Sequence, residues 1–580
     1  MPRATSWTRP QTEAACSPRS ASRRARTQRV SIEFKAARQA LSLMLFYCSK
    51  WCEMEFDYIV VGSGSSGSPL AARLVEKGAS VLLLEAGKRE RINLTRVPAA
   101  LIHTIGHDRY DWNFTTEPDP SRNGLVEKWP RGRVPGGSSA INGMIFIRGA
   151  AKDYDAWESL GNTGWGWDSV LPYFRKMETA DQGSDNAYRG GMGPQRVSAL
   201  RWRHPVSQKF IDSFVNAGVP LNADLNGRSH EGVAWNQGST YNGFRHSAFD
   251  AFVRPKLKDP KLTFMDGSLV ERIMMNGVRA TGIAFERDGQ KLKASARRGV
   301  ILSAGSINSP QILMLSGIGD PAELARHGIS TVVRSPEVGR NLMEHPGLYV
   351  LAELDIPTGN AYTSALGRLR AAAEWALMRR GVLSVPTAQV LAFLKSAPDQ
   401  NEPDLQFHLF PFGYFRDNGR LRVPKRNLVT ILANVNYPKS RGHLALRSKD
   451  PREPVAIYPR LLDHPDDLDG VLRGLAWIRK VASTPPFGSS VLKLLDVPPQ
   501  EAGKAANEAY VRDATVPFLH PVGTCRMGND DGAVLSPDLR VRGAERLWVA
   551  DASIFPRHIA GNTNATSIMI GERAADLIHP

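Results

Sequence analysis

A strand, a glycine-rich turn and a helix follow one another where the regular pattern of the chain begins. Residues 57–61 are an apolar run of strand length, residues 62–67 read Gly-Ser-Gly-Ser-Ser-Gly, and residues 69–76 have a helical pattern. A second strand, 80–84, ends at Glu85. The glycines permit a tight turn and close approach of a pyrophosphate to the helix N-terminus, and the carboxylate can bind a ribose. The segment predicts a dinucleotide-binding unit, with a plain Gly-rich connection as the alternative.

Length and composition indicate a globular protein of about two domains, because 580 residues with 42% hydrophobic side chains exceed one ordinary core. Helical and strand patterns alternate, interrupted by 51 Gly and 39 Pro, which favours a mixed α/β class. After residue 54 the only cysteine is Cys525, so this region cannot form an internal disulfide. That usage suits a reducing compartment and predicts a cytoplasmic protein. Cys48 and Cys52 lack a second pair at metal-ligand spacing, and no metal site is predicted.

The net charge of +17 is concentrated at the N-terminus, where residues 1–54 contain ten Lys or Arg and three Glu. Residues 1–53 show no fold pattern, and Met54 stands immediately before Glu55-Phe56-Asp57, where the domain would naturally begin. We expect a disordered leader or an upstream start-codon assignment, with a targeting peptide as an open alternative. The remaining basic charge is scattered without interleaved aromatics. It predicts a solvated surface and no nucleic-acid partner.

Residues 129–149 form a segment rich in Gly and Ser, with unusual backbone demands. Gly136 and Gly137 permit positive φ and close approach of a flat ligand. Ser138, Ser139 and Asn142 add polar anchors. A ligand-binding loop and a complicated connection are both consistent with this pattern.

Two further segments predict elements of the nucleotide domain. Residues 262–285 show short strands around turns at Asp266-Gly267 and Asn276-Gly277, a hairpin-like arrangement. Residues 299–305 read as a strand that leads into a helix, with Ser309 as N-cap, Pro310 at the first helical position and Gly317 as the stop.

The character of the chain changes between about 346 and 515. Residues 366–380 predict a basic amphipathic helix, for which an ordinary surface helix is favoured and a membrane-surface helix stays open. Alternating strands at 405–409, 428–437 and 443–446 predict an antiparallel sheet. Such a sheet could form the floor of a pocket, with candidate lining residues Phe407, Phe410, Phe412 and Tyr414.

Reactive polar groups gather near the C-terminus, at 519–528, 547–553 and 561–566. His520 is the best general-base candidate, because its unperturbed pKa lies near neutrality and Pro521 holds its backbone in a loop. His345 and His558 are interpreted as structural residues. Residues 565–578 predict a closing helix whose N-terminus could receive the polar edge of a flavin ring.

These motifs, taken in order, resemble those of the glucose–methanol–choline (GMC) oxidoreductase family over nearly all of residues 55–580. The similarity rests on residues 62–67, Gly132-Arg133, 136–139, Asn142-Gly143, Arg148-Gly149, 153–157, 305–313, 339–346, His520-Pro521 and Asn564. It implies an α/β (α+β) fold with a discontinuous Rossmann-like FAD-binding domain and a substrate domain on an antiparallel sheet. The expected boundaries are 55–175, 245–345 and 516–580 for the FAD domain, and 176–244 and 346–515 for the substrate domain.

The resemblance also assigns roles to residues. His520 matches the catalytic histidine and Asn564 the second active-site position, so that His520 would take the hydroxyl proton while the hydride passes to flavin N5. The predicted FAD-binding residues are Gly62, Gly64, Gly67 and Glu85 at the ADP half, Gly137, Asn142, Asp551 and Thr566 around the flavin, Val270 at the adenine through its backbone, and along the same motifs Ser63, Ser65, Ser66, Ala86, Arg133, Gly136, Ser138, Gly143, Met144, Ser303, Gly305 and Ala552.

Three positions depart from the family pattern. Ile141 stands where some members carry the histidine that attaches FAD, so noncovalent FAD is expected. Glu344 replaces a common Asp, which changes little. Gln389 is the loose match to the carboxylate of choline-type members, and a quaternary ammonium substrate would lose its counter-ion there.

The expected activity is FAD-dependent oxidation of a small-molecule alcohol, with electrons passed to a quinone or other non-oxygen acceptor. Choline and aliphatic or aromatic alcohols are all candidate substrates. A hydroxynitrile lyase-type enzyme on the same fold and a non-catalytic flavoprotein are the alternatives. Peripheral membrane association stays open, and the oligomeric state is not predicted.

Overall fold

Two seven-stranded sheets organise the protein in the computed structural model, which describes residues 54–89, 94–181, 187–417 and 420–580. Residues Glu55–Pro580 form one compact unit. The predicted leader, 1–53, and the cysteines Cys16, Cys48 and Cys52 lie outside the described residues. Cys525 is a buried free thiol.

The first sheet has a parallel core typical of nucleotide-binding folds. Its strands run in the order β11, β2, β1, β14, β13, β12, and β27 also pairs with β14. The pairs among β11, β2, β1, β14 and β27 are parallel, whereas β13 is antiparallel to both neighbours. The strands are β1 (Glu55–Val61), β2 (Val81–Leu84), β11 (Leu262–Met265), β12 (Ser268–Asn276), β13 (Arg279–Arg287), β14 (Gln290–Leu302) and β27 (Leu547–Val549).

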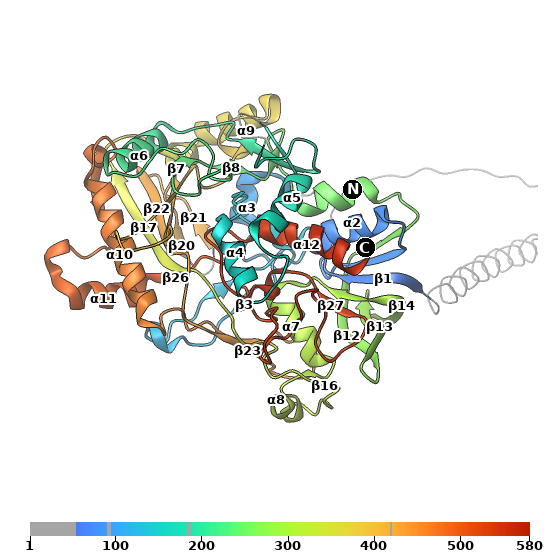
Figure 1. Cartoon of the computed structure of the whole chain (residues 1–580). Helices are drawn as coiled ribbons and strands as arrows, with labels where there is room; N and C mark the ends of the chain where they lie inside the picture. Colours follow the sequence, from blue (N-terminus) through green and yellow to red (C-terminus); the bar gives the residue numbers. More distant parts are fainter. Residues whose placement is uncertain (1–53, 90–93, 182–186, 418–419) are drawn as a thin grey trace, which may run out of the picture. The chain divides into compact units, whose positions relative to one another are not determined.

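Helices α2 (Gly67–Glu76) and α12 (Asn564–Ile578) pack against each other beside this sheet, as Figure 1 shows for the blue and red ends of the chain. Their contact is close, since a Cβ added to Gly571 would lie 2.1 Å from the Ser66 carbonyl oxygen. The turn before α2 is equally tight. A Cβ on Gly67 would lie 1.9 Å from Gly62 O, which explains why glycine is required there.

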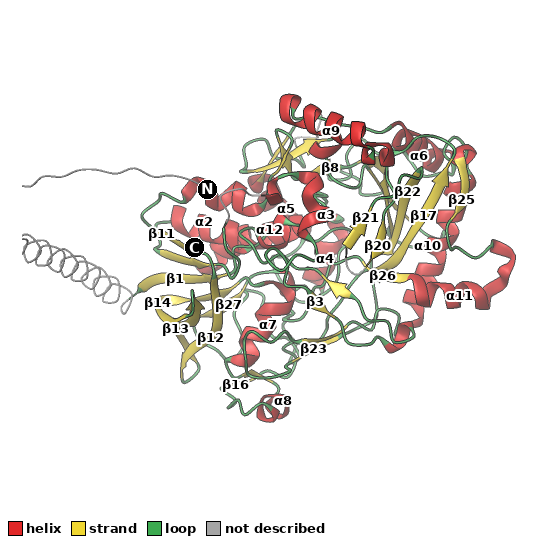
Figure 2. Cartoon of the chain, turned by 180° about the vertical axis from the view of Figure 1, so that it is seen from behind, coloured by secondary structure: helices red, strands yellow, loops and turns green. Residues whose placement is uncertain are grey.

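The second sheet is wholly antiparallel and runs in the order β25, β17, β22, β19, β18, β7, with β26 also on β17. Helices α6 (Pro205–Asn216) and α10 (Pro465–Ser483) pack on it, and Figure 2 shows α10 alongside β17 and β22. The strands are β7 (Gly232–Trp235), β17 (Pro346–Leu354), β18 (Val390–Leu394), β19 (Leu405–Phe410), β22 (Leu428–Val435), β25 (Val491–Leu494) and β26 (Thr515–Pro517).

These sheets confirm the predicted mixed α/β class with a parallel nucleotide-binding sheet and an antiparallel one. The first sheet draws its strands from 55–84, 262–302 and 547–549, and the second from 232–235 and 346–517. The two-domain boundaries stay a prediction, because 55–580 forms a single compact unit.

Three local expectations are corrected. Helix α7 (Gly305–Leu315) begins before Ser309 and contains Pro310. Pro310 has no N–H to donate to the Ser306 carbonyl, and this carbonyl instead accepts a hydrogen bond from Thr524 Oγ1 at 2.6 Å. Strand β11 pairs in parallel with β2, so the turn at 266–267 does not close a hairpin. Strand β23 (His443–Ala445) pairs with β24 (Ala456–Tyr458) instead of β22.

The remaining helices connect the sheets. They are α3 (Leu101–Thr104), α4 (Ala151–Ser159), α5 (Trp167–Met177), α8 (Pro321–Arg326), α9 (Ala365–Met378) and α11 (Gly503–Ala514). Short strands are β3 (Phe114–Thr115), β4 (Lys128–Trp129), β5 (Glu178–Ala180), β6 (Gln195–Ala199), β8 (Gln237–Gly238), β9 (Thr240–Tyr241), β10 (Phe244–Arg245), β15 (Ile318–Gly319), β16 (Val333–Arg334), β20 (Phe415–Asp417) and β21 (Arg420–Arg422). Among the described helices, none has the length and apolar content to span a bilayer.

Candidate active site

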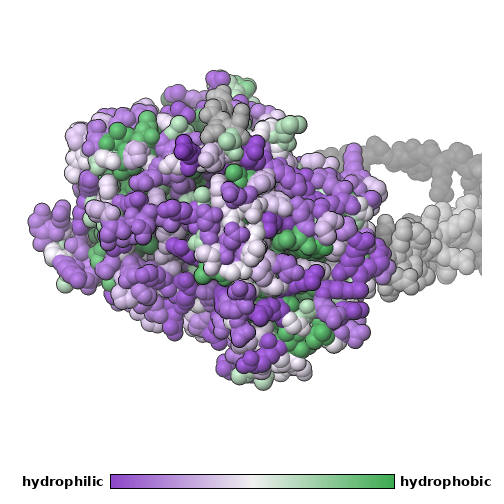
Figure 3. Space-filling view, in the orientation of Figure 1, coloured by the Kyte–Doolittle hydropathy of each residue, from purple (hydrophilic) through white to green (hydrophobic). Residues whose placement is uncertain are grey.

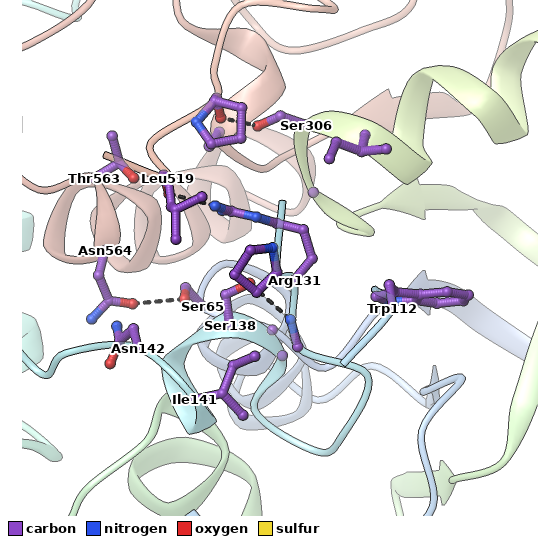
Figure 4. A pocket seen from close by; sticks show the side chains of 18 of the residues that line it. Ser65, Trp112, Arg131, Ser138, Ile141, Asn142, Ser306, Leu519, Thr563 and Asn564 are labelled. Carbon is purple, nitrogen blue, oxygen red and sulfur yellow. Dashed lines mark hydrogen bonds between the residues drawn. The ribbon is translucent and has the colours of Figure 1, made fainter. Parts of the chain in front are cut away.

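A cavity of about 600 Å³ is lined by residues of both sheets and of the loops between them. Figure 4 shows how loop 131–142, the start of α12 and the segment around Leu519 converge on it. Most of the predicted site residues line this cavity: Gly62, Gly64, Ser65, Ser66, Glu85, Ala86, Gly137, Ser138, Asn142, Gly143, Met144, Val270, Ser303, Gly305, His520, Asp551, Ala552 and Asn564.

Five predicted residues do not line the cavity but support it. Ser63 donates its N–H and hydroxyl to Glu85, and its carbonyl accepts from the N–H of Gly136 at 3.1 Å. Gly67 permits the tight turn. The guanidinium of Arg133 lies 4.8 Å from the ring centroid of the lining residue Trp112. Thr566 is buried and bonds to Tyr154 Oη at 2.7 Å, so its hydroxyl is committed away from the cavity.

The carboxyl group of Glu85 is held rigidly at the end of β2. Its Oε2 accepts from Ser63 Oγ at 2.8 Å and its Oε1 from the N–H of Gly87 at 2.9 Å. Burial raises the pKa of Glu85 to about 7. The fixed geometry presents an acceptor beside the glycine turn, as a ribose requires.

Several helices begin at the cavity, and their N-termini have no side-chain caps. Helix α2, helix α12 and the 3₁₀ turn Gly137–Ala140 each lack a capping side chain and an acidic residue in the first turn. Their backbone N–H groups therefore provide donors for an anionic or carbonyl-rich ligand. Ser66 also lines the cavity, and its hydroxyl has no hydrogen-bond partner among the residues that the structure describes. This arrangement fits the pyrophosphate and ring carbonyls of FAD.

Gly64 and Gly137 approach each other closely in the cavity wall. A Cβ on Gly137 would lie 3.0 Å from the Cα of Gly64, and Gly137 has a φ of +52°. Any side chain here would fill the space between the two loops. Asp551 secures the opposite wall, because its Oδ2 accepts from the N–H of Gly305 at 2.8 Å and from Ser309 Oγ at 2.5 Å.

His520 lies at the end of the cavity, and the side chain beside it is Asn562. Its Nε2 is 2.9 Å from Asn562 Nδ2. Asn564, the predicted second active-site residue, instead accepts from Ser65 Oγ at 2.7 Å, which Figure 4 shows. Helix α12 begins at Asn564, so this side chain turns toward α2, whereas Asn562 in the preceding loop reaches His520.

A chain of hydrogen bonds defines the protonation of His520. His345 Nε2 lies 3.0 Å from Asn436 O and 3.1 Å from Ile559 O; carbonyl oxygens only accept, so Nε2 carries the proton. In a neutral His345 the Nδ1 is then an acceptor, and it lies 3.0 Å from His520 Nδ1. His520 must donate through Nδ1, which leaves the lone pair of Nε2 facing Asn562.

Gln406 fixes the orientation of the asparagine amide. Its Nε2 donates to Asn562 Oδ1 at 3.0 Å, so Asn562 presents its NH₂ group to His520. One amide N–H of Asn562 meets the histidine lone pair, and the other is free to bind an oxygen of a ligand. The arrangement provides a proton acceptor and a hydrogen-bond donor at neighbouring points.

Burial keeps the histidines of this region neutral. It lowers the pKa of His520 and of His345 well below the ordinary value, and neighbouring histidines lower both further. The same cause lowers the pKa of His558 to about 3 and that of His408 to about 4. His520 is therefore an unprotonated imidazole at neutral pH, able to accept a proton.

Glu344 holds the backbones of the two central histidines together. Its Oε1 accepts from the N–H of His520 at 2.8 Å and from the N–H of His345 at 2.9 Å. Burial raises the pKa of Glu344 to about 8. Arg131, whose Nη2 donates to Leu519 O at 2.5 Å, secures the same loop from the cavity side (Figure 4).

An aromatic wall extends from His520 along the second sheet and comprises Tyr349, His408, Phe410, Phe412, Tyr414 and Phe518. Phe410, Phe412 and Tyr414 line the cavity as predicted, but Phe407 does not. Side chains alternate along β19, so Phe407 packs in the core beneath the sheet, while His408 and Phe410 face the cavity. Gln389 also lies outside the lining, because it bonds to Ser207 Oγ at 2.8 Å and to the N–H of His204 at 2.9 Å.

Sequence reasoning missed Asn562, Gln406 and the direct contact of His345 with His520. Asn562 stands two positions from the predicted Asn564, and the sequence contains no signal for which of the two reaches the histidine. His345 was assigned a structural role, although it lies in a motif that carried the family resemblance. For Gln406 the only sequence signal is the alternation of side chains along β19, which places Gln406 on the same face of the strand as His408.

The fold and this site define a flavin-dependent oxidoreductase that acts on alcohols. The comparisons agree: the amino- and carboxyl-terminal GMC oxidoreductase models match residues 56–347 and 438–571. The chain belongs to the GMC oxidoreductase family and is an FAD-dependent enzyme of the alcohol-oxidising type.

Similar sequences include an oxygen-dependent choline dehydrogenase of Sinorhizobium medicae, 37% identical over 90% of this chain and 96% of the relative. The mitochondrial choline dehydrogenase of Mus musculus is 37% identical over 91% of this chain and 90% of its own. Among solved structures, pyridoxine 4-oxidase from Mesorbium loti has a TM-score of 0.80 with 27% identity, covering 90% of this chain and 98% of its own. An Aspergillus oryzae formate oxidase variant has a TM-score of 0.84 with 25% identity, covering 91% and 98%.

The buried histidines predict acid sensitivity. Each is neutral in the folded protein but binds a proton near pH 6.5 once unfolded, so their contribution to stability is present above that pH and is lost as the pH falls toward the folded pKa. His558→Gln removes one such group. Between about pH 6 and pH 4, the free energy of unfolding should then fall less steeply by about 1.4 kcal/mol per pH unit.

The measurement is denaturant unfolding of the FAD-bound protein at several pH values. The matched control is His103→Gln, which replaces an exposed histidine of α3 and should keep the wild-type slope. Equal slopes for wild type and His558→Gln would show that His558 is not held neutral in the folded protein.

Proposed function

We propose that this protein oxidises a primary alcohol to an aldehyde, with His520 as the general base and Asn562 as the donor to the alcohol oxygen. The observation that carries the proposal is the directed chain from Gln406 and His345, which leaves His520 Nε2 unprotonated and in contact with an amide N–H of Asn562. When bound, FAD supplies the acceptor for the hydride that leaves the alcohol carbon.

The residues of the chain account for the proton. An alcohol hydroxyl that replaces the Asn562 N–H at His520 Nε2 donates its hydrogen to this nitrogen, and the Asn562 amide binds the oxygen as negative charge develops. His520 becomes an imidazolium as the carbonyl forms. Its Nδ1–H continues to donate to His345, so the ring does not turn during the transfer.

His345 acts in this scheme as a positioning residue. It contacts no ligand position of its own, because its Nε2 is committed to Asn436 O and Ile559 O. Its Nδ1 accepts from His520 and thereby selects the tautomer in which Nε2 of His520 is the base. The proposal requires only the directions of the hydrogen bonds given above.

The substrate we propose is a neutral alcohol with an apolar or aromatic substituent. Each carboxyl group in the described lining already has a protein partner: Glu127 forms an ion pair with Arg122 at 2.7 Å, whereas Glu85 and Asp551 accept hydrogen bonds from Ser63 and Ser309. These contacts disfavour a role as counter-ion to a quaternary ammonium group, although aromatic rings can also bind such a cation. The similar choline dehydrogenases make choline the substrate to compare.

For the acceptor we propose a quinone or another non-oxygen acceptor. The names of similar proteins divide on this point, since the Sinorhizobium medicae relative is described as oxygen-dependent and the mouse relative as a mitochondrial dehydrogenase. The cysteine usage supports a reducing compartment for this chain.

The direct test mixes the FAD-bound enzyme anaerobically with choline, benzyl alcohol and linear alcohols, and follows loss of the oxidised-flavin absorbance. We expect fast reduction by a neutral alcohol and slower reduction by choline. Re-oxidation is then compared between oxygen and a soluble quinone. Bound flavin that no alcohol reduces would favour a lyase or a non-catalytic flavoprotein.

Variants separate the two asparagines in the same assay. His520→Ala should slow flavin reduction about 10²–10⁴-fold, and Asn562→Ala about 10²-fold, because each removes a group that acts on the alcohol O–H. Asn564→Ala should weaken FAD retention, since it breaks the bond to Ser65. The opposite pattern, with Asn564→Ala slow and Asn562→Ala fast at saturating FAD, would reassign the second active-site residue.

Substitutions of His345 should have a distinct effect on the kinetics. His345→Ala should lower kcat about tenfold or more with little change in KM, because His520 loses the acceptor that fixes its tautomer. His345→Gln, whose Oε1 can accept from Nδ1–H, should recover part of the loss and restore the pH profile of kcat. Equal loss in both variants, with an unchanged pH profile, would indicate a packing role alone.

FAD is proposed to bind noncovalently. The position matching the covalent histidine of some family members is Ile141, an aliphatic side chain that lines the cavity. Acid precipitation should release all flavin into the supernatant, as measured by absorbance. Flavin that remains in the protein pellet would contradict this expectation.

A further inference from the structure

Helix α9 (Ala365–Met378) presents an apolar face that no described part of the chain covers. Of its fourteen residues only Ala371 is buried. Leu366, Leu369 and Leu377 are 77%, 68% and 83% exposed. With Ala373 and Ala376 they recur at helical spacing and lie on one side of the helix. We call these five residues the α9 face. Figures 1 and 2 place α9 at the periphery, and the space-filling view of Figure 3 shows an otherwise largely hydrophilic surface.

The opposite side of α9 is anchored, so the α9 face is held outward. Trp375 Nε1 donates to Gly243 O at 2.9 Å, and its ring packs edge-on against Phe244 at 5.2 Å between centroids. The guanidinium of Arg379 lies over both rings, at 4.8 Å and 4.7 Å. Ser364 caps the helix by accepting from the N–H of Gly367. Because these contacts fix the rotation of the helix, exposure of its leucines is a property of the fold.

Basic side chains lie beside the α9 face. Arg370, one position round the helix from Leu377, and Arg380, just after the helix, are exposed, and residues 365–380 carry a net charge of +3. The one acid, Glu374, is paired with Arg370 at 2.7 Å. An exposed leucine stripe bordered by arginines matches the surface of an anionic bilayer, where leucines enter the headgroup boundary and guanidinium groups bind lipid phosphates.

The chain on both sides of α9 belongs to the cavity wall. Before it, Asn360 Oδ1 accepts from the N–H of Gly413 at 2.8 Å, and Gly359 N–H donates to Pro411 O at 2.7 Å. These bonds hold the loop that carries Phe412 and Tyr414. After it, Thr387 lines the cavity directly. A membrane bound to α9 would lie close to the segments that shape the aromatic end of the cavity.

We propose that the α9 face docks this protein on the surface of anionic lipid bilayers. Docking requires no spanning segment and stands apart from the reaction proposed above. It would bring the aromatic end of the cavity near a phase in which apolar alcohols and quinones concentrate. Scattered single apolar residues are common on protein surfaces, whereas three leucines on one anchored helix face form a contiguous patch.

The test is co-sedimentation of the full-length, FAD-bound protein with vesicles of phosphatidylglycerol and phosphatidylcholine, and with vesicles of phosphatidylcholine alone. We expect binding to the anionic vesicles that falls about tenfold or more in the triple variant Leu366→Gln/Leu369→Gln/Leu377→Gln. Arg370→Gln/Arg380→Gln should weaken binding to anionic vesicles and make it less sensitive to salt.

The matched control replaces three equally exposed apolar residues elsewhere, Met192, Leu221 and Leu492, by Gln. It should bind as the wild type does. Because residues 1–54 are also basic, anionic vesicles could bind the leader instead; undiminished binding of the α9 triple variant would overturn the proposal. Absence of wild-type binding would overturn it too, as would concentration-dependent dimerisation that the α9 triple variant abolishes. Flavin content and alcohol-driven flavin reduction, measured without vesicles, verify that each variant is folded.

Discussion

The pairing of β26 with β17 is the constraint on which the candidate active site depends. Pro346 lies opposite Pro517 in this antiparallel pair, and the N–H of Phe518 donates to His345 O at 3.1 Å. His345 immediately precedes β17 and His520 closely follows β26, so their rings meet although 175 positions separate them. Glu344 adds two hydrogen bonds to the same junction. The second sheet thus builds the histidine end of a cavity whose other end belongs to the first.

Burial lowers the pKa of the histidines in this interior, and this one effect governs both the acid stability of the fold and the ability of His520 to accept a proton. Burial that keeps His520 unprotonated makes it a competent proton acceptor at neutral pH, and the same burial makes the fold sensitive to acid. The hydrogen-bond chain adds direction. Because His345 Nε2 donates to two carbonyl oxygens, the position of each proton along the chain is fixed, and the lone pair of His520 Nε2 is directed toward Asn562 at the cavity. Stability and reactivity therefore arise from one buried network.

The cavity joins two surfaces of different character. Its nucleotide end consists of glycine turns and uncapped helix N-termini, which suit phosphates and ring carbonyls. Its substrate end consists of aromatic side chains on the antiparallel sheet. The segments around α9 adjoin that aromatic end, so substrate selection and the proposed lipid contact involve neighbouring parts of the chain. The FAD-binding class is shared with the family.

The sequence by itself determined the glycine turn and the strand–turn–helix unit around it, because these depend on local patterns: an apolar run of strand length and glycines at fixed spacing. The cofactor class and the candidate role of His520 followed from the resemblance of motifs in fixed order to those of the family. Only the tertiary structure decided that Asn562 meets His520 while Asn564 meets Ser65, and that β23 pairs with β24. It also decided that Phe407 is core and that Pro310 lies inside a helix. The physical reason is that these outcomes depend on partners distant in sequence, such as Thr524 for the carbonyl freed by Pro310, which no local pattern encodes.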